Sequence, residues 1–268
     1  KKYNFTKIYN FNHTAIVFKF PYLRTSFIKT GMPVTKIISS TFFNTFFLAC
    51  ASIIFALIFG VLFGVVSALA KDSFFDRFLL YFSVVGMALP SFFSSIIVAW
   101  VFGYLLHNYT GLNMYGSLYE LDDYGVSNSL VLKNLILPAF TLGIRPLAVI
   151  VQLSRNSLLE VLSMDYIRTA HAKGLNKKIV IFKHALRNSL NPVITAVSGW
   201  FASLLAGAVF VEYIFAWNGL GKEIVDALNN MDLPVVMGSV LFISVIFIVI
   251  NILVDIIYML VDPRIKIE

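Results

Sequence analysis

A basic stretch at Ser163–Pro192 holds the residues of this chain best suited to engage a charged partner. Between Arg155 and Arg187 the sequence carries seven Lys or Arg residues against two acidic residues. Clustered cations of this kind bind anionic surfaces, which for a membrane protein are lipid headgroups or the acidic side chains of another protein. The residues themselves leave these two alternatives open.

The basic stretch is predicted to form two short helices joined by a glycine. Ser163 can cap the first helix, and Asp165 in its first turn would complement the helix dipole. No helix breaker follows until Gly174, which is a favourable C-terminal stop. A second basic helix is predicted over residues 177–188.

The other residues whose side chains could take part in catalysis or metal binding do not form a recognisable site. The segment G-L-G-K at 219–222 lacks the spacing of a phosphate-binding loop, G-x-x-x-x-G-K-[ST]. The four histidines are scattered at no metal-ligand spacing, and Cys50 is the only cysteine. The apolar segments contain no H-E-x-x-H motif and no usefully spaced carboxylates, so an intramembrane enzyme is disfavoured.

The composition indicates that most of the chain's surface faces lipid. Of the 268 residues, 59% are hydrophobic and 13% are charged, about half the charged share of a globular protein. The mean hydropathy is +0.83. The net charge of +7 agrees with Lys and Arg gathered in the cytoplasmic loops of a membrane protein. No interleaving of aromatic and basic residues accompanies it, so we expect no nucleic-acid partner.

Five apolar segments are long enough to cross a bilayer, which predicts an all-α polytopic membrane protein. The predicted spans cover residues 38–70, 78–106, 135–159, 190–211 and 235–260. Pro90 lies in the middle of the second span, where loss of a backbone hydrogen bond favours a kink. Gly, Ala and Ser are frequent in the fourth span between Gly199 and Ala208, which predicts close packing against a neighbouring helix.

The charges of the loops predict the orientation of the spans. The basic loop at 155–187 is placed in the cytoplasm, and the acidic loops at 107–133 and 212–235 on the opposite side. Residues 1–36 then lie outside, although they carry seven Lys or Arg and no acidic residue. The chain is therefore either a five-span protein with an unusual exterior segment or a protein whose first span precedes residue 1. Because the sequence does not begin with Met, we expect the second.

Two ionisable residues fall within predicted spans. Arg145 lies in the middle of the third span, and Asp255 lies in the last. A charge at such a position is costly and normally faces a cavity or a charged partner. Arg145 is therefore a candidate for lining a translocation pathway, with a structural pair or a side chain extended toward the nearer membrane interface as the alternative, whereas a structural role is expected for Asp255.

Sequence motifs follow one another in order along most of the chain. They are F-I-K-T-G-M-P-V-T at 27–35, N-T at 44–45, L-P-S at 89–91, R-N-S-L-L-E-V-L at 155–162, D-Y-I-R-T-A-H-A-K-G-L at 165–175, H-A-L-R-N-S-L-N-P-V at 184–193, L-L-A-G-A-V-F-V-E-Y-I-F at 204–215, N-G-L-G-K-E-I-V-D-A at 218–227 and N-I-L-V-D-I-I-Y-M-L-V-D-P-R at 251–264. Their order and spacing resemble the permease subunits of ABC transporters. The resemblance is to the dipeptide/oligopeptide (and nickel) permease branch of the type I importers.

The resemblance implies a type I ABC importer permease fold with six spans, of which five are present here. It divides the chain into an extracytoplasmic segment at 1–36, a transmembrane domain at 37–262 and a cytoplasmic tail at 263–268. Within the domain, a coupling loop at 160–188 is expected to dock on a separate ATPase subunit. The residues assigned to ATPase coupling are Asp165, Tyr166, Ile167, Arg168, Thr169, Ala170, Ala172, Lys173, Gly174 and Leu175. The general family signature has Glu-Ala-Ala where this chain has Arg168-Thr169-Ala170, a variant typical of the peptide branch.

The same resemblance implies a function, a location and partners. The chain is expected to be the non-catalytic permease of an ATP-driven importer of di- or oligopeptides in the bacterial cytoplasmic membrane. ATP and Mg would be bound by the ATPase subunits and no cofactor by this chain. A second homologous permease and an extracytoplasmic substrate-binding protein would complete the complex. The alternatives are a permease for nickel chelates or another small solute, and a self-sufficient channel or secondary transporter, which would have no need of the basic loop.

Overall fold

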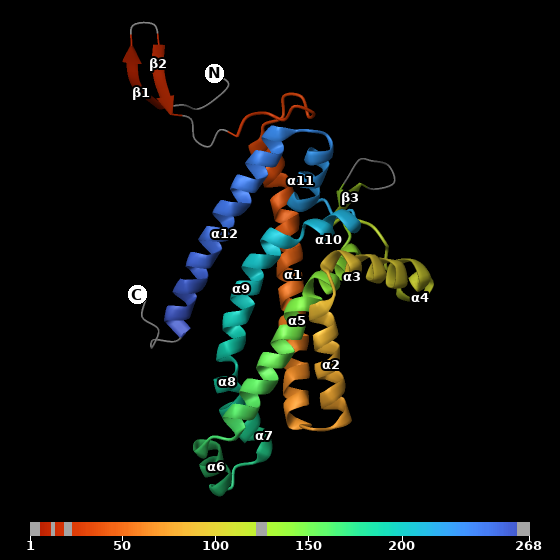
Figure 1. Cartoon of the computed structure of the whole chain (residues 1–268), viewed down its shortest axis with the longest axis vertical. Helices are drawn as coiled ribbons and strands as arrows, with labels where there is room; N and C mark the ends of the chain where they lie inside the picture. The colour runs from red at the N-terminus through yellow and green to blue at the C-terminus, as the bar shows by residue number, and fades with distance from the viewer. Residues whose placement is uncertain (1–5, 12–13, 19–22, 122–127, 262–268) are drawn as a thin grey trace.

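The computed structural model describes residues 6–11, 14–18, 23–121 and 128–261, and the chain forms a helical bundle with two small hairpins (Figure 1). Three helices contain segments long and apolar enough to cross a membrane, namely α1 (Val34–Leu69), α5 (Lys133–Leu162) and α12 (Leu233–Val261). Two shorter apolar helices, α2 (Phe74–Ala88) and α9 (Asn191–Gly207), pack beside them. The predicted helical membrane protein is confirmed, whereas the predicted tail at 263–268 lies outside the described residues.

The two hairpins lie outside the bundle of long helices. β1 (Thr6–Phe11) pairs antiparallel with β2 (Thr14–Phe18), and β3 (Tyr119–Leu121) pairs antiparallel with β4 (Asn128–Leu130). Neither hairpin was expected from the sequence, because the segments that form them lack the regular alternation of a half-buried strand.

Glycines allow α1 and α5 to approach closely. Gly60 and Gly64 are four residues apart and therefore share one face of α1. A Cβ atom on Gly60 would lie 2.7 Å from Cγ2 of Ile150, and one on Gly64 would lie 2.5 Å from Cβ of Ser154. Close packing was also predicted for the fourth span. Ala202 and Ala208 of that segment are buried, whereas a Cβ atom on Gly199 would have no described atom within 4 Å.

The second predicted span is broken at Pro90 rather than kinked. α2 ends at Ala88, and the chain continues as α3 (Ser91–Val98) and the π-helix η1 (Ala99–Leu105), which turn away from α2 by 111°. Leu89 has extended backbone angles, as expected for a residue that precedes proline. The proline position was predictable, but the size of the bend depends on what α3 packs against.

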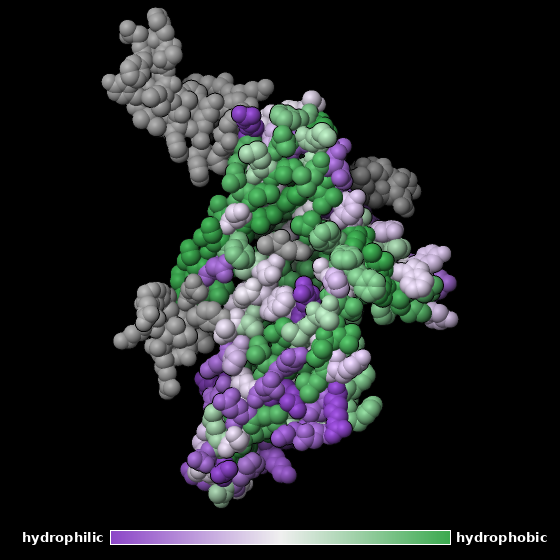
Figure 2. All heavy atoms as spheres, viewed as in Figure 1, coloured by the Kyte–Doolittle hydropathy of each residue, from purple (hydrophilic) through white to green (hydrophobic). Residues whose placement is uncertain are grey.

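The connecting segments and short helices lie at the two ends of the bundle. The turn between α1 and α2 and the segment at 163–190 lie at one end, here called the α6 end (Figure 1). Residues 23–33, α4 (His107–Thr110), α10 (Val209–Ile214) and α11 (Leu220–Asn229) lie nearer the other, here called the α11 end. Hydrophilic residues gather at the α6 end (Figure 2). Loops predicted to share a side of the membrane therefore share an end of the bundle.

Candidate functional site

The basic stretch folds as short helices around a glycine elbow. α6 (Asp165–Ala172) is followed by a continuous helical run of α7 (Lys177–Ile179), η2 (Val180–Ala185) and α8 (Leu186–Ser189). Gly174 has φ +79°, a conformation that side chains rarely adopt. The N–H of Leu175 donates to Ala170 O at 3.3 Å, and that of Gly174 donates to His171 O at 2.9 Å. These bonds form a Schellman motif and confirm the predicted stop.

The cap predicted at Ser163 is wrong. α5 continues to Leu162, so Ser163 ends α5 and its Oγ donates to Glu160 O at 2.7 Å. Met164 is the residue that precedes α6, and it supplies no side-chain cap. The cap lies instead at the second helix, where the Asn176 side chain accepts from Lys178 N at 3.0 Å.

Eight of the ten residues assigned to coupling are exposed on the loop, and two are turned inward. Ile167 is buried, and Ala170 is half-buried beside it. The cluster around Ile167 joins α6 to the long helices and consists of Val65 and Ala68 of α1, Leu158 and Val161 of α5, and Val180 and Ala185 of η2. Ile167 therefore holds α6 on the bundle, and the exposed residues form the outer surface of α6.

Polar contacts within the loop are few and peripheral. Asn188 Nδ2 donates to the hydroxyl of Tyr166 at 3.0 Å, which ties α8 to α6. Arg168 and Asp165 form an ion pair at 3.4 Å, but their side chains are 77% and 94% exposed. An exposed pair of this kind contributes little stability, so apolar packing around Ile167 is the main attachment of α6.

A buried ion pair that sequence reasoning missed fastens α2 to α5 at the α6 end. Arg155 donates to both carboxylate oxygens of Asp76, from Nε and Nη2, each at 2.7 Å. Ser67 of α1 donates to the same carboxylate, as does the backbone N–H of Asp72 at 2.9 Å. The side chains of Asp76 and Arg155 are 2% and 14% exposed. Because these residues are 79 positions apart, no local sequence pattern could reveal their pairing.

Ile167 and the ion pair together connect four helices at the α6 end. The apolar cluster joins α6 to α1 and α5, and the ion pair joins α2 to the same two helices. Packing and hydrogen bonds therefore connect α6 with α1 and α5, and these two helices with α2.

Arg145 lies near the middle of α5 with an exposed side chain. No described residue forms an ion pair with it, so the alternative of a structural pair gains no support within the chain. The side chain of Asp255 lies outside the part of the chain that the structure describes.

At the α11 end, a buried carboxylate binds the start of α11. Glu212 accepts hydrogen bonds from Thr45 Oγ1 at 2.6 Å and from the N–H groups of Gly221 at 2.7 Å and Lys222 at 3.1 Å. A Cβ atom on Gly219 would lie 2.4 Å from this carboxylate, so the glycine is required by close approach. The arrangement places an acidic group at a helix N-terminus, where the helix dipole is favourable.

The turn at 217–221 is packed on the bundle. Trp217 is fully buried, its Nε1 donates to Asn44 O at 3.0 Å, and Asn44 Nδ2 donates to Asn218 O at 2.7 Å. The sequence left open whether this turn contacts a binding protein or packs on the spans. The burial and hydrogen bonds show that it packs on α1.

The burial of Glu212 predicts a pH-dependent stability. Burial raises the pKa of Glu212 to about 7 from its ordinary 4.5, although its three hydrogen bonds act in the opposite direction. The stabilisation from this group is therefore complete below pH 4.5 and is lost as the pH rises through about 7. We expect the free energy of unfolding of the purified protein to fall across this interval by about 1.4 kcal/mol for each pH unit, and the thermal midpoint to fall with it. Glu212→Gln should remove the slope, and a flat wild-type profile would contradict the assignment.

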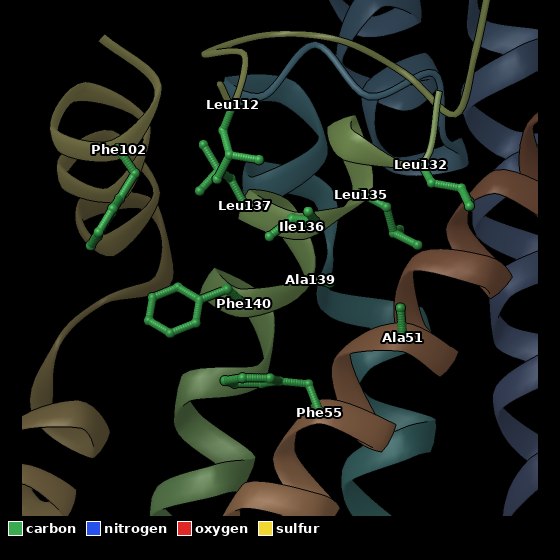
Figure 3. Close-up of a pocket in the computed structure, with 10 residues that line it drawn as sticks. All are labelled: Ala51, Phe55, Phe102, Leu112, Leu132, Leu135, Ile136, Leu137, Ala139 and Phe140. Carbon is green, nitrogen blue, oxygen red and sulfur yellow. The ribbon is translucent and has the colours of Figure 1, made fainter. Parts of the chain in front are cut away.

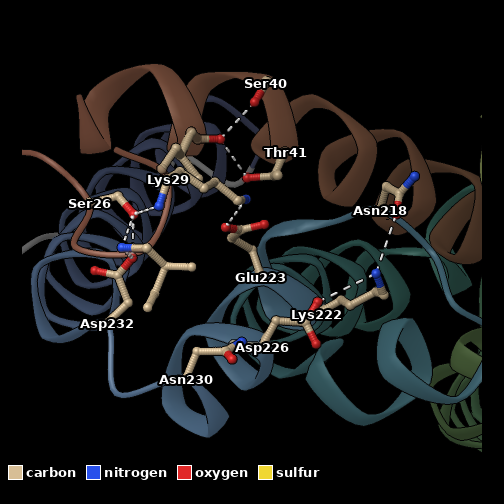
Figure 4. A network of polar contacts seen from close by, with 12 residues as sticks. Ser26, Lys29, Ser40, Thr41, Asn218, Lys222, Glu223, Asp226, Asn230 and Asp232 are labelled. Carbon is tan, nitrogen blue, oxygen red and sulfur yellow. Dashed lines mark hydrogen bonds and ion pairs between the residues drawn. The ribbon is translucent and has the colours of Figure 1, made fainter. Parts of the chain in front are cut away.

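A polar network ties residues 23–33 to α11 and α12 (Figure 4). Asp232 accepts from Ser26 Oγ and, at 3.1 Å, from Phe27 N. Burial raises the pKa of Asp232, but the hydrogen bonds that it accepts outweigh burial and hold the pKa below its ordinary value. Lys29 Nζ lies 2.5 Å from Glu223 Oε1 of α11. Residues 23–33 are thereby fixed in place before α1 begins.

A cavity of about 430 Å³ opens between α1, η1 and α5 (Figure 3). Its lining is entirely apolar and comprises Ala51, Phe55, Phe102, Leu112, Leu132, Leu135, Ile136, Leu137, Ala139 and Phe140. With no hydrogen-bonding side chain, it offers nothing to bind the termini of a peptide. Among the described residues, no group of three His, Cys, Asp or Glu side chains is placed to hold a metal ion.

Comparison with known proteins identifies the family. Residues 60–267 match the family described as binding-protein-dependent transport system inner membrane component. The dipeptide transport system permease protein DppB of Alkalihalophilus pseudofirmus is 38% identical over 256 residues, covering 89% of this chain and 76% of that protein. The oligopeptide transport system permease protein AppB of Bacillus subtilis (strain 168) is 38% identical over 244 residues, covering 90% of this chain and 75% of that protein.

Solved structures share the fold. A chain of the MetNI methionine ABC transporter in an inward-facing conformation superposes with a TM-score of 0.66 at 14% identity, covering 85% of this chain and 98% of that chain. The match supports the type I importer permease fold. Together with the family match, the apolar helices make this a multi-pass protein of the cytoplasmic membrane. The chain belongs to the family of binding-protein-dependent transport system inner membrane components.

Proposed function

We propose that the chain is the permease subunit of an ATP-driven importer of di- or oligopeptides, and that its α6–α8 loop docks on a separate ATPase subunit. The observation that carries the proposal is the attachment of α6, whose outer surface is free while Ile167 is buried among α1 and α5. A loop that only bound lipid headgroups would not need such rigid fixation. The exposed residues Asp165, Tyr166, Arg168, Thr169, Ala172, Lys173, Gly174 and Leu175 form the docking surface.

In this mechanism the loop transmits motion and does no chemistry. ATP binding closes the ATPase pair and carries α6 with it. Because α6, α1, α2 and α5 are joined at the α6 end, the displacement tips these helices between inward-open and outward-open states. ATP and Mg are bound by the ATPase, which agrees with the absence of a phosphate-binding loop from the sequence.

The remaining partners occupy other surfaces of the chain. A second permease subunit completes the pathway, and a substrate-binding protein delivers cargo at the α11 end. The family description names dependence on a binding protein, and the similar chains are named as peptide permeases. These names favour peptides over nickel chelates, and dependence on a binding protein disfavours a self-sufficient channel or secondary transporter.

Reconstitution of the complete transporter tests this function. The chain, a second permease, the ATPase subunits and the binding protein should together accumulate a labelled dipeptide in vesicles only when ATP is present. Uptake without the ATPase would support a channel or secondary transporter, and ATP-driven uptake of a nickel chelate but no peptide would support the other solute.

We also propose that Arg145 lines the translocation pathway. Its charge lies mid-span on an exposed face, where contact with lipid is costly. Arg145→Met should lower peptide uptake by about tenfold, the effect of one lost charge-assisted hydrogen bond. The measurement is the initial rate of ATP-driven uptake at several peptide concentrations. Wild-type rates at every concentration would remove Arg145 from the pathway.

A further inference from the structure

Arg145 belongs to a polar stripe along α5. Arg145, Val149, Gln152 and Asn156 follow at intervals of four, three and four residues, which places them on one face of the helix. Arg145 and Asn156 are exposed, and Val149 and Gln152 are half-exposed. Among the described residues, Gln152 donates to Met87 Sδ at 3.5 Å, a weak acceptor, and Asn156 Oδ1 accepts from Arg155 Nη1 at 3.2 Å. Arg145 forms no ion pair with a described residue, and each amide of the stripe has a single described partner.

The stripe faces away from α1. The side of α5 that contacts α1 carries Gly143, Ile150 and Ser154, each of which lies against an α1 residue. At 100° per residue, Arg145 and Gln152 lie about 160° or more from the centre of that side. The face of α5 that carries Arg145 and Gln152 is therefore not covered by α1, the helix with which α5 has its most extensive contact.

α9 packs beside α5 and also carries an exposed side. Val193 is buried and Val197 half-buried in the cluster that joins α9 to α5. Thr195, Gly199 and Ser203 follow at intervals of four on a different side of α9, and all three are exposed. Two neighbouring helices thus carry small or polar residues that are exposed or half-exposed among the described residues.

Most of the exposed surface of α1 is apolar, in contrast with the polar residues exposed on α5 and α9. Every exposed position of α1 between residues 43 and 69 is apolar, among them Ile58 at 58% and Leu62 at 51% exposure. Apolar side chains suit contact with lipid, whereas exposed amides and a guanidinium do not. Figure 2 shows hydrophilic and intermediate residues extending from the α6 end up the middle of the visible face.

We infer that the open faces of α5 and α9 form one wall of the aqueous substrate pathway, in which Arg145 binds the carboxylate terminus of the passing peptide. The inference rests on the proposed function. Arg145 is the only charged residue of the stripe, and a guanidinium binds a carboxylate with two parallel hydrogen bonds. Gln152 and Asn156 supply amide groups that can bond the peptide backbone, and Gly199 leaves room for it.

Thiol labelling tests the wall independently of transport. In a Cys50→Ala background, Gln152→Cys, Asn156→Cys and Ser203→Cys are compared with Ile58→Cys and Leu62→Cys in the complete complex in vesicles. A charged methanethiosulfonate reagent reacts with the thiolate, which forms in water and is suppressed in apolar surroundings. We expect the wall positions to react at least about tenfold faster than the α1 controls, since one unit of thiol pKa changes the thiolate fraction tenfold.

The wall assignment is overturned if positions 152, 156 and 203 are as unreactive as 58 and 62, both with and without ATP. Such a result would mean that lipid or the second permease covers this face. A complex that labels as expected but transports no peptide would instead overturn the proposed function and leave the wall in place.

The carboxylate assignment has a separate test. Uptake of a peptide with a free C-terminus is divided by uptake of the same peptide with an amidated C-terminus, for wild type and for Arg145→Met. The binding protein's own preference cancels, because only the permease differs. We expect the ratio to fall by about tenfold in the variant. A ratio equal to that of the wild type would overturn the role of Arg145 in binding the carboxylate.

Discussion

Asp76→Ala is expected to destabilise the α6 end by about 3–5 kcal/mol, because it leaves the guanidinium of Arg155 buried without its partner. The pair is bidentate, with both distances at 2.7 Å and the Asp76 side chain 2% exposed. Ser67 would also lose its acceptor. The measurement is the free energy of unfolding of the detergent-purified protein in denaturant.

Asp165→Ala is the matched control for Asp76→Ala. It also removes an Asp from an Asp–Arg pair, but there the Asp side chain is 94% exposed and the expected cost is below about 1 kcal/mol. The double variant Asp76→Leu/Arg155→Met should recover much of the loss, because an apolar pair leaves no charge unpaired. Equal effects of Asp76→Ala and Asp165→Ala would show that the buried pair does not hold α2 to α5.

Ile167→Ala and Ala172→Asp are expected to abolish uptake in two different ways. Ile167 is 2% exposed in the cluster that fixes α6, and its truncation should cost about 2–5 kcal/mol of local stability. The ATPase should still bind and hydrolyse ATP, but its motion would no longer reach α1 and α5. Ala172 is exposed, so Asp there leaves the cluster intact and places a charge in the docking surface.

The two variants are distinguished by measuring ATPase retention and uptake together. Ala172→Asp should lose the ATPase during purification, whereas Ile167→Ala should retain it with ATP hydrolysis uncoupled from uptake. Ala170 and Gly174 are poorer test positions. Ala170 is half-buried beside Ile167, and Gly174 has φ +79°, so substitutions there disturb the loop itself. Retention of the ATPase by both variants would contradict the assignment of the outer surface of α6 to docking.

Much of the fold could be predicted from the sequence because a membrane helix is recognised from the apolar composition of its own segment. Long apolar runs located the spans, and loop charge grouped the loops by side. The glycine elbow at Gly174 was also readable, since its conformation follows from local backbone requirements. Pro90 was recognised as a disruption, but whether a proline kinks or ends a helix depends on its surroundings.

Features set by distant contacts could not be read from the sequence. Arg155 was counted among the loop's cations, yet Asp76 holds it in the bundle. Ile167 was assigned to docking as part of a motif, and only the burial of its side chain reveals an anchoring role. Glu212 was placed in an acidic exterior loop, whereas its partners come from α1 and α11. In each case the function of the residue is set by a neighbour far away in the chain.

Crosslinking from α6 tests the docking of the loop on an ATPase most directly. With Cys50 replaced by Ala, Ala172→Cys would carry a thiol on the exposed surface of α6, and Leu62→Cys would carry one on the exposed face of α1 as a control. Treatment of the complete complex with a short thiol-to-amine crosslinker should join the Ala172→Cys chain, but not the Leu62→Cys chain, to the ATPase subunit. Failure of the Ala172→Cys chain to form this adduct in an active complex would contradict the account.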